Sequence, residues 1–539
     1  MGSGLESLIF GMWMVGVGWS IKGIGCGLWM GDGWYGDVMQ DGSAVQVDTV
    51  EAGTAAELGR LADEGGAAAL PTAAVVLLAL AIGFMPIPYD PDLWFHLADG
   101  RWIVRQWDVP QVDVFSFTRS GKLWVPHSWL FDVGVYLSWS RLGPRAAEAL
   151  MAVVFAGAMV LAYRLMVRRG VMAVYAAGVV LGLAIAAGNT RGLRPQVWSL
   201  FLAMVVIDLL VRHRDRPGWR LVGWTAGVFL LWAQVHSACV MGLGVMGLWL
   251  AGRVVERVWG GNATCREAAV LAVSVAAALA AILVTPHAMD HVDYVRMTMG
   301  LEELKLTEEW RVPAIWPVQA PDIYMYLLAA AVAWAVVRRW RRIGWAELTL
   351  CGGLLVLGFS GVRHIPLACM GSAPLFAAAL GREAVDAGKA ETLTVRFAVT
   401  VGVLAAVVLA LLCRYPTDVW TRYASREPIR GVAALLELDR PVRLFTTMNT
   451  GSYVTFAADG RLAVFADSRC DVYGDEILRA ARLAMGGREW EGTFARWGID
   501  AAVVDAWCPL ARILEADGGW RVLAKEPGAV TFVRAGRAE

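Results

Sequence analysis

Residues 70–96 are LPTAAVVLLALAIGFMPIPYDPDLWFH, an apolar run that ends in two carboxylates and a histidine. The apolar part is long enough to form a membrane-spanning helix. Ionisable side chains at the mouth of such a helix usually serve a function. Pro91 fixes the backbone between Asp90 and Asp92, so that both carboxylates can face one ligand. That ligand is either a divalent cation, such as Mg²⁺ or Mn²⁺, or the proton of an attacking hydroxyl group.

The composition is that of an integral membrane protein. The 539 residues are 57% hydrophobic and only 18% charged, they include 26 tryptophans, and their mean hydropathy is +0.52. The net charge is zero, so no basic surface indicates a nucleic-acid partner. Membrane lipids are instead the surroundings that this composition requires.

Apolar segments of membrane-spanning length recur along residues 67–413. We expect eleven spans, near residues 70–87, 145–167, 172–188, 196–212, 220–236, 238–253, 267–285, 322–337, 345–360, 364–380 and 394–412. With this count, four basic clusters fall on one side, at Arg168–Arg169, Arg212–Arg220, Arg253–Arg257 and Arg338–Arg342. Because lysine and arginine favour cytoplasmic loops, the sequence predicts a multi-pass protein of the cytoplasmic membrane with these clusters inside.

Two segments fall outside this scheme. Residues 129–139 are apolar, but a span there would reverse the side of every later loop, so we expect a helix along the outer membrane surface. Residues 1–66 form an N-terminal extension, which is either an extra weak span, an uncleaved signal-like segment or an over-extended gene start. The first external loop then covers residues 88–128.

The polar residues of the external loops converge on one face. Beside Asp90 and Asp92, the residues expected at a substrate site there are His96, His127, Arg191, Arg194, His236, His287, Glu309, Arg311, Arg363 and His364. Arginine suits phosphate or pyrophosphate, which makes Arg191, Arg194 and Arg363 a predicted phosphate site. A carboxylate facing them would take a proton from an acceptor hydroxyl or hold a divalent cation. Because free nucleotide donors do not supply reactions outside the cell, these residues predict transfer from a phosphate-activated donor anchored in the bilayer.

Each of these residues also has a structural alternative. Asp90 and Asp92 can cap the helix that follows them. Arg191, Arg194 and Arg363 can reach lipid phosphates instead of a substrate. His96 and His127 can hydrogen-bond the backbone of a loop, and Glu308 and Glu309 can form a solvated face of their loop.

Residues 414–539 have mixed polarity and predict a small α/β domain. Eleven spans after a cytoplasmic start place this domain outside the cell. Strands are expected at residues 442–446, 463–466, 501–504 and 529–533, and helices at residues 474–485 and 488–497. The charged residues Asp467, Arg469, Asp471 and Asp475 form either a functional cluster or a polar turn. A disulfide between Cys470 and Cys508 is left open, because sequence does not fix their geometry.

The order of these motifs resembles that of the GT-C superfamily of polytopic glycosyltransferases, and within it bacterial membrane proteins without an assigned reaction. The matching stretches are Asp90–Arg101, Pro126–Leu130, Arg194–Gln196, Trp232–His236, Glu309–Arg311, Arg363–Pro366 and Asp467–Asp475. The resemblance implies an all-α polytopic membrane domain with a small external C-terminal α/β domain that helps to shape the acceptor side. It also implies a glycosyltransferase that uses a polyprenyl-phosphate sugar as donor, with Asp90 and Asp92 as base or metal ligands.

Two other classes of function stay open. A transporter or flippase of a lipid-linked or anionic solute usually has ionisable residues near the bilayer midplane, whereas charges here are scarce within the spans. A non-catalytic relative that scaffolds an envelope assembly differs from the enzyme only in activity. The sequence identifies neither the sugar nor the acceptor of the predicted transfer.

Overall fold

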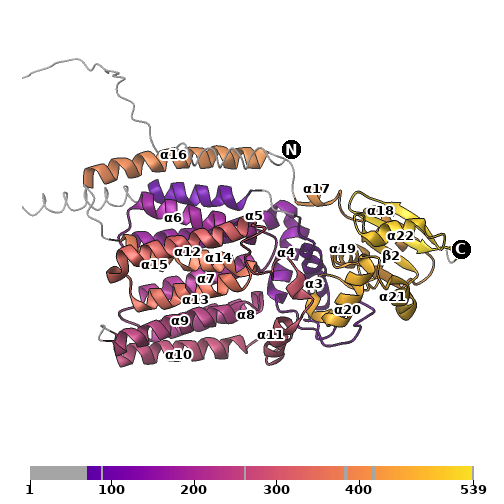
Figure 1. The fold of residues 1–539 in the computed structure, drawn as a ribbon, viewed down its shortest axis with the longest axis horizontal. Coiled ribbons are helices and arrows are strands. Elements are labelled where there is room, and N and C mark those ends of the chain that lie inside the picture. The colour runs from indigo at the N-terminus through magenta and orange to yellow at the C-terminus, as the bar shows by residue number, and fades with distance from the viewer. Residues whose placement is uncertain (1–69, 86–88, 260–262, 382–386, 415–418, 537–539) are drawn as a thin grey trace, which may run out of the picture. The chain divides into compact units, whose positions relative to one another are not determined.

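The computed structural model describes residues 70–85, 89–259, 263–381, 387–414 and 419–536, so the N-terminal extension lies outside the described residues. Most helices of the membrane domain share one direction (Figure 1). These helices are Leu70–Gly83, α5 (Pro144–Arg168), α6 (Ala173–Ala186), α7 (Gln196–Arg212), α8 (Trp219–Val235), α9 (Cys239–Val258), α10 (Cys265–Ile282), α12 (Ala320–Arg339), α13 (Trp345–Ser360), α14 (Ile365–Gly371), α15 (Ala373–Leu380) and α16 (Ala387–Arg414). A shorter helix, α11 (Asp290–Gly300), lies between α10 and α12 in the sequence.

Helical residues occupy every segment that was predicted to span the membrane. Five of the described helices are long and apolar enough to cross a membrane by length and composition: Pro144–Arg168, Cys239–Val258, Cys265–Ile282, Ala320–Arg342 and Val395–Leu412. The chain is therefore a mostly helical membrane protein, as predicted, while the count of eleven spans stays a prediction.

The predicted span at residues 364–380 is divided into α14 and α15. Pro366 lies in the first turn of α14 and Pro374 in the first turn of α15. Proline lacks the backbone N–H that a continuous helix needs, so it favours the start of a new helix at each position. The hydroxyl of Ser372, between the two helices, donates to the carbonyl oxygen of Ala368 at 2.6 Å.

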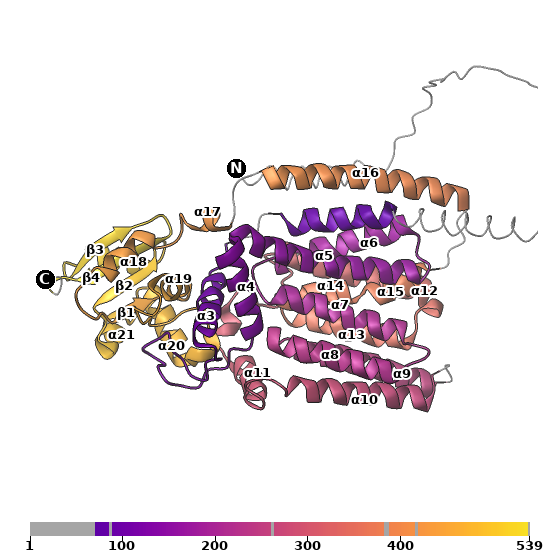
Figure 2. The same ribbon diagram turned by 180° about the vertical axis from the view of Figure 1, so that it is seen from behind.

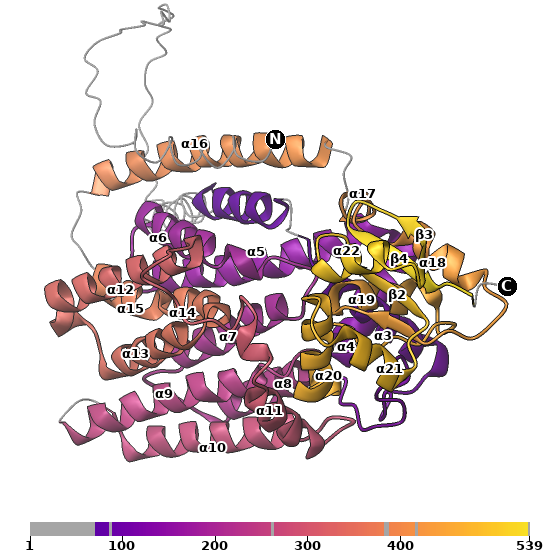
Figure 3. The same ribbon diagram turned by 45° about the vertical axis from the view of Figure 1, so that its right-hand side comes forward.

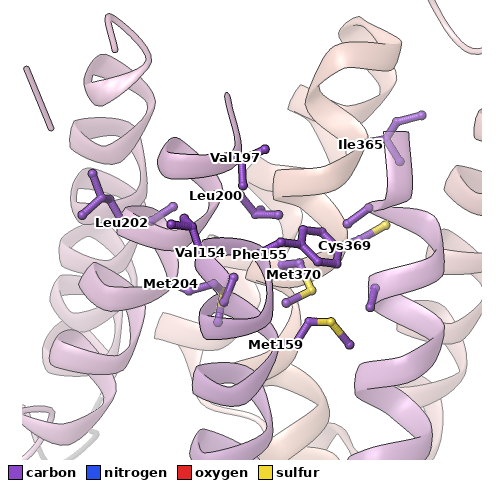
Figure 4. Packing of buried hydrophobic residues seen from close by; sticks show 14 of the residues in the cluster. Val154, Phe155, Met159, Val197, Leu200, Leu202, Met204, Ile365, Cys369 and Met370 are labelled. Carbon is purple, nitrogen blue, oxygen red and sulfur yellow. The ribbon is translucent and has the colours of Figure 1, made fainter. Parts of the chain in front are cut away.

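Small and apolar side chains hold α5, α7 and α14 together. Figure 4 shows Phe155 of α5 and Met370 of α14 gathered with Leu200 of α7, and all three are buried. Gly157 of α5 lies against Phe201 of α7, where an added Cβ would come within 2.9 Å of the ring. Close approach through small residues is a usual basis of helix association in membranes, where lipid is as apolar as the side chains.

Two helices near the start of the described chain, α3 (Asp92–Gln106) and α4 (Trp129–Leu142), run across the direction of the bundle (Figure 2). Gly100 of α3 lies against the backbone of Asp132 in α4 and leaves no room for a Cβ. This close approach brings side chains of α3 within hydrogen-bond distance of α4. The segment predicted as a surface helix, residues 129–139, is thus helical and packs on α3, α5 and α8. Its position along the membrane surface stays a prediction.

The four basic clusters meet at one end of the bundle. Glu347 of α13 is 1% exposed, accepts a hydrogen bond from Arg214 and lies 3.8 Å from Arg169. Arg214 also pairs with Glu256 of α9 at 2.8 Å. The fourth cluster, residues 338–342, ends three residues before α13. Direct ion pairs thus join the segments that carry the first three clusters, whereas their common side of the membrane stays a prediction.

The C-terminal domain contains a sheet of four strands covered by helices (Figure 3). Its elements are α17 (Val419–Tyr423), α18 (Ile429–Leu436), β1 (Leu444–Thr446), α19 (Met448–Ala458), α20 (Cys470–Met485), α21 (Trp490–Trp497), β2 (Ala501–Asp505), α22 (Pro509–Ala516), β3 (Trp520–Lys525) and β4 (Ala529–Arg534). The strand order is β1-β2-β4-β3, with β1 parallel to β2 and the other pairs antiparallel. The predicted α/β domain is confirmed in outline.

Two details of the prediction for this domain are wrong. The segment at residues 463–466 is no strand: only Val464 forms isolated bridges, to Ser116 and Leu444. The strand β3 was missed, because it lies at the sheet edge with exposed residues among apolar ones and lacks a continuous apolar run. The disulfide between Cys470 and Cys508, which the sequence left open, is absent, since both cysteines are free. The sulfur of Cys470 lies 3.5 Å from that of Met448 instead.

Arg469 joins the C-terminal domain to the loop between α3 and α4. Its guanidinium is 2.8 Å from Asp113 of that loop and 2.8 Å from Asp467 of its own domain. It also stacks on Trp124, with the guanidinium carbon 4.4 Å from the ring centroid. All of these side chains are buried. Breaking such a buried pair by removing one partner costs about 3–5 kcal/mol, so this contact fixes the start of α20 against the loop.

Candidate active site

Arg194, which lies just before α7, binds three carboxylates from separate parts of the chain. Its guanidinium donates to both oxygens of Asp90, one of them at 2.8 Å. It also lies 2.9 Å from Oδ2 of Asp92 and donates to Glu309. The planar fork of arginine is suited to several such contacts at once. Asp90 also accepts the backbone N–H of Asp92 at 3.1 Å, so it caps α3 and binds Arg194 at the same time.

Burial and charge act against each other in this cluster. Burial raises the pKa of Asp92 to about 6, although the charge of Arg194 opposes the increase. Burial also acts to raise the pKa of Glu309, but Arg194 outweighs it and lowers that pKa overall. Burial alone would lower the pKa of Arg194, yet Asp92 and Asp90 raise it well above the usual value. Arg194 is therefore charged at any physiological pH, and the cluster carries excess negative charge when its acids are ionised.

Arg363, just before α14, provides a second guanidinium beside this cluster. Its backbone N–H donates to the carbonyl oxygen of Glu309 at 3.0 Å, and its guanidinium lies 4.3 Å from the ring centroid of Trp310. Within the described residues, no carboxylate lies within 4.0 Å of this guanidinium. Burial lowers the pKa of Arg363, and the charge of Glu309 partly restores it. The stacked ring fixes the arginine while its N–H groups stay available to an anion.

The predicted metal ligands do not form a metal site in this arrangement. Throughout the described part of the chain, no group of three or more His, Cys, Asp or Glu side chains is placed to hold a metal ion. Both oxygens of Asp90 and one of Asp92 contact the guanidinium of Arg194. A divalent cation needs several of these oxygens as ligands, so Arg194 competes with it for the same donors. The carboxylates fit a guanidinium, and we derive no step through a metal.

A second buried group lies deeper along α3. Nδ1 of His96 is 2.5 Å from Oδ1 of Asp132 in α4, and Ser128 donates to the same carboxyl group at 3.1 Å. Burial lowers the pKa of His96 to about 4 and raises that of Asp132 to about 8. Burial therefore favours the neutral form of both groups over the ion pair. Burial also raises the pKa of Asp99, which Asp132 raises further, so these acids stay largely protonated.

His127 and His236 lie near each other, with ring centroids 5.7 Å apart. His127 stacks on Tyr294 of α11, with centroids 4.5 Å apart and planes 20° from parallel. His236 is buried, and its Nδ1 is 2.7 Å from the hydroxyl of Ser199 in α7. The two histidines thus present rings to one space, His127 from the turn before α4 and His236 from the end of α8.

These side chains surround a cavity of about 800 Å³ that has a polar end and an apolar end. The polar end is lined by Asp92, His96, His127, Asp132, Arg194, His236, Glu309, Arg363, His364 and Asp471. The apolar end is lined by residues of α9 and α13, namely Val240, Met241, Gly244, Val245, Leu248, Gly353, Leu354 and Leu357. A second cavity of about 350 Å³ shares Arg194, Glu309 and Arg363 with the first. The first cavity therefore extends from the charged cluster to the apolar surfaces of two bundle helices.

Three of the predicted residues have other positions or partners. Arg191 is absent from the lining of the described cavities, and it donates to the backbone oxygens of Gly188 at 3.1 Å and Ile82 at 2.8 Å. Arg311 lines the smaller cavity but pairs with Asp322 at 2.8 Å. His287 is buried and lines neither cavity. Burial lowers its pKa, so its ring is neutral at pH 7. Arg191 and Arg311 therefore chiefly bind other groups of the protein near their own loops, and their positions in the sequence did not indicate this.

Sequence reasoning did not place Asp471 or Tyr294 in the site. Asp471 belongs to the charged cluster at the start of α20. The sequence of that cluster was compatible both with a polar turn and with a place in the cavity. Tyr294 lies in α11, whose sequence DHVDYVRMTMG carries no motif that would have identified it. Only the packing of α11 against α20 brings these residues to the cavity.

The fold is similar to those of solved membrane proteins. ArnT from Cupriavidus metallidurans in the apo state aligns with a TM-score of 0.52 at 13% identity, over 89% of this chain and 99% of ArnT. The archaeal oligosaccharyltransferase AglB from Archaeoglobus fulgidus, in complex with an inhibitory peptide and a dolichol-phosphate, aligns with a TM-score of 0.52 at 11% identity. That alignment covers 86% of this chain and 74% of AglB. No protein-family model and no curated protein matches the sequence. At these identities the likeness concerns the fold alone, and that fold is the one that the sequence resemblance implied.

Proposed function

We propose that this chain is a glycosyltransferase that moves a sugar from a polyprenyl-phosphate donor to an acceptor at the outer face of the cytoplasmic membrane. The observation that carries the proposal is the divided cavity, in which Arg194 and Arg363 lie at one end and the apolar surfaces of α9 and α13 at the other. A polyprenyl phosphate has the same division between an anion and a hydrocarbon chain. The GT-C fold supports the same kind of reaction, and the AglB structure contains a dolichol-phosphate.

The donor phosphate is assigned to Arg363 first. Arg194 already shares its N–H groups among Asp90, Asp92 and Glu309, whereas no carboxylate of the described chain pairs with Arg363. A phosphodiester carries one negative charge, which Arg363 balances. When the sugar leaves, the phosphate becomes more negative, and Arg194 is near enough to stabilise the additional charge. Arg363 thus binds the phosphate of the donor, and Arg194 stabilises the lipid phosphate as the sugar leaves.

The polyprenyl chain is assigned to the apolar wall of the cavity. Gly244 of α9 lines this wall, and an added Cβ at this position would meet nothing within 4 Å. Leu248 and Leu354 extend the apolar surface further along α9 and α13. Burying hydrocarbon here gains little over lipid itself, so the wall guides the chain while the charged end gives the affinity.

Asp90 and Asp92 are assigned to holding Arg194 in place. Asp90 is 7% exposed and contacts the guanidinium through both oxygens, which fixes its direction. Asp92 lines the cavity and adds a third oxygen. The first-loop acids therefore act on the donor through Arg194, and the order Asp-Pro-Asp places both of them at the start of α3.

Binding of undecaprenyl phosphate by the purified full-length protein tests this proposal. Arg363→Ala should weaken the Kd by about 10- to 100-fold, because a hydrogen bond to a charged group contributes about 1.5–3 kcal/mol. Arg296→Ala is the matched control, since Arg296 of α11 is exposed and pairs only with Asp293 at 3.5 Å. It should leave the Kd within twofold. A Kd that is equal in the wild type and the Arg363→Ala variant would contradict the proposed phosphate site.

A further inference from the structure

Asp471 differs from the other acids of the cavity in its surroundings. Of the described carboxylates that line the larger cavity, Asp92 and Glu309 pair with Arg194, and Asp132 pairs with His96. No Lys, Arg or His side chain of the described chain lies within 4.0 Å of Asp471. Asp471 is thus the described cavity acid with neither a guanidinium nor a histidine ring as a direct partner, and a carboxylate without such a partner is the better proton acceptor.

Asp471 lines the same cavity as the proposed phosphate site. It lies in the first turn of α20, on the wall that the C-terminal domain contributes to the cavity. Tyr294 of α11 lies near both Asp471 and Arg363. Burial raises the pKa of Tyr294, the charge of Asp471 raises it further, and the charge of Arg363 opposes both effects. The tyrosine hydroxyl thus lies within electrostatic range of the acid on one side and of the arginine on the other.

We propose that Asp471 is the catalytic base, which accepts the proton of the acceptor's hydroxyl group. This inference rests on the proposed function. Asn449 and Ser468 of the same domain line the cavity beside Asp471 and offer hydrogen bonds to a polar acceptor. The stacked rings of His127 and Tyr294 form the facing wall.

The step balances without any further reactant. The acceptor oxygen forms a bond to the anomeric carbon of the donor while its proton moves to Asp471. The bond between that carbon and the phosphate oxygen breaks, and its electron pair leaves with the polyprenyl phosphate. Arg363 and Arg194 stabilise the resulting charge, and the proton on Asp471 passes to solvent before the next turnover.

The charges around Asp471 suit this task. Burial raises its pKa to about 7, while Arg469 acts to lower it and Asp467 and Asp113 act to raise it. From α11, which is one of the elements packed against α20, Tyr294 lies near the acid and is neutral at pH 7. A base with a pKa near the working pH combines a large ionised fraction with a useful strength. Asp92 is less suited, since Arg194 holds one of its oxygens at 2.9 Å.

The test uses full-length protein in detergent, undecaprenyl-phosphate-linked glucose, mannose and galactose as donors, and glycerol as a hydroxyl acceptor. Release of undecaprenyl phosphate is measured from pH 5 to 9. Asp471→Asn should slow release by about 100-fold or more, which is the usual contribution of a general base. It should keep the wild-type Kd for undecaprenyl phosphate within twofold. The wild-type rate should rise with pH up to about 7, as the pKa of Asp471 requires, and the variant should lose this rise.

Glu476→Gln is the matched control, because Glu476 is an exposed carboxylate on the same helix that pairs with Arg496. It should leave rate and binding unchanged, and Asp471→Glu should restore part of the rate. Release by Asp471→Asn within threefold of the wild type, or release by no donor in a wild-type protein that binds the lipid, would overturn the assignment of Asp471. A wild-type protein that fails to bind undecaprenyl phosphate would overturn the proposed function itself. The two failures are thus distinguishable.

Discussion

Replacing Arg194 by glutamine removes the single cation that three carboxylates share. The guanidinium is 22% exposed, the Asp90 side chain 10% and the Asp92 side chain 25%, so these two pairs are largely shielded from water. Glu309 is 49% exposed, and solvent screening makes its share small. Removing one partner of a buried ion pair costs about 3–5 kcal/mol. We expect the apparent Tm of Arg194→Gln to fall by at least about 6 °C at pH 8, using about 2 °C per kcal/mol.

This loss should depend on pH in a defined direction. The pKa of Asp92 in the folded state is already raised to about 6, and without Arg194 it rises further, because the charge that opposes the effect of burial is gone. A folded state that binds more protons than the unfolded state loses stability as the pH rises from about 4 through the raised pKa. The difference in Tm between variant and wild type should therefore be smaller at pH 5 than at pH 8.

Intrinsic tryptophan fluorescence during heating of the detergent-purified protein measures both effects. Arg296→Gln is the control, since its side chain is 78% exposed and its pair with Asp293 contributes little. An Arg194→Gln variant whose Tm lies within 2 °C of the wild type at pH 8 would refute the reasoning, because the three acids would then not depend on this arginine.

Two further predictions concern the apolar end of the cavity and the buried hydrogen bond between Trp94 and Glu427. Gly244→Leu should weaken undecaprenyl phosphate binding at least tenfold without lowering the Tm, because a side chain fits there without strain but fills the apolar end of the cavity. Gly178→Leu is the control, since an added Cβ at Gly178 also meets nothing within 4 Å but this residue lies outside the cavity lining. The control variant should bind the lipid normally. Glu427 is 1% exposed and accepts a hydrogen bond from Trp94 at 2.7 Å, and burial raises its pKa to about 7. Since this pKa lies above the unfolded value of about 4.3, the group costs stability as the pH rises from there to about 7. Glu427→Gln should therefore raise the Tm relative to the wild type at pH 8 more than at pH 5, and an equal shift at both values would contradict the assignment.

The sequence predicted the helical parts of this fold well because their signal is local. An apolar run of membrane length forms a helix whatever its neighbours are, since lipid offers no partner for backbone groups. The common side of the basic clusters followed from the same count, and the pairing of Arg214 with Glu256 and Glu347 agrees with it. The missed strand β3 and the incorrect strand at residues 463–466 are both short and depend on pairing across the sheet, which no local pattern records.

The residues of the site were predicted with less success than the helices, because they meet only through packing. Arg194 and Arg363 were found from their position at the ends of helices, and both line the cavity. Arg191 shares that position, but its guanidinium turns to the backbone oxygens of Gly188 and Ile82. Asp471 reaches the same cavity from a residue far along the chain, after α20 has packed against α11. The sequence shows the type of each residue and its place at the end of a helix, whereas neighbouring residues decide the direction of its side chain.

The bond between Arg469 and Asp113 also has a consequence for biosynthesis. The loop that carries Asp113 is made early, yet its buried partner belongs to the last part of the chain, and Arg119 of the same loop donates to the carbonyl oxygen of Tyr473, 354 residues later. A ribosome that has finished every helix of the bundle has therefore not yet delivered the residues that complete the polar end of the cavity. Truncated chains would insert without a finished site, so the cell would not make a partly active protein while translation is still under way.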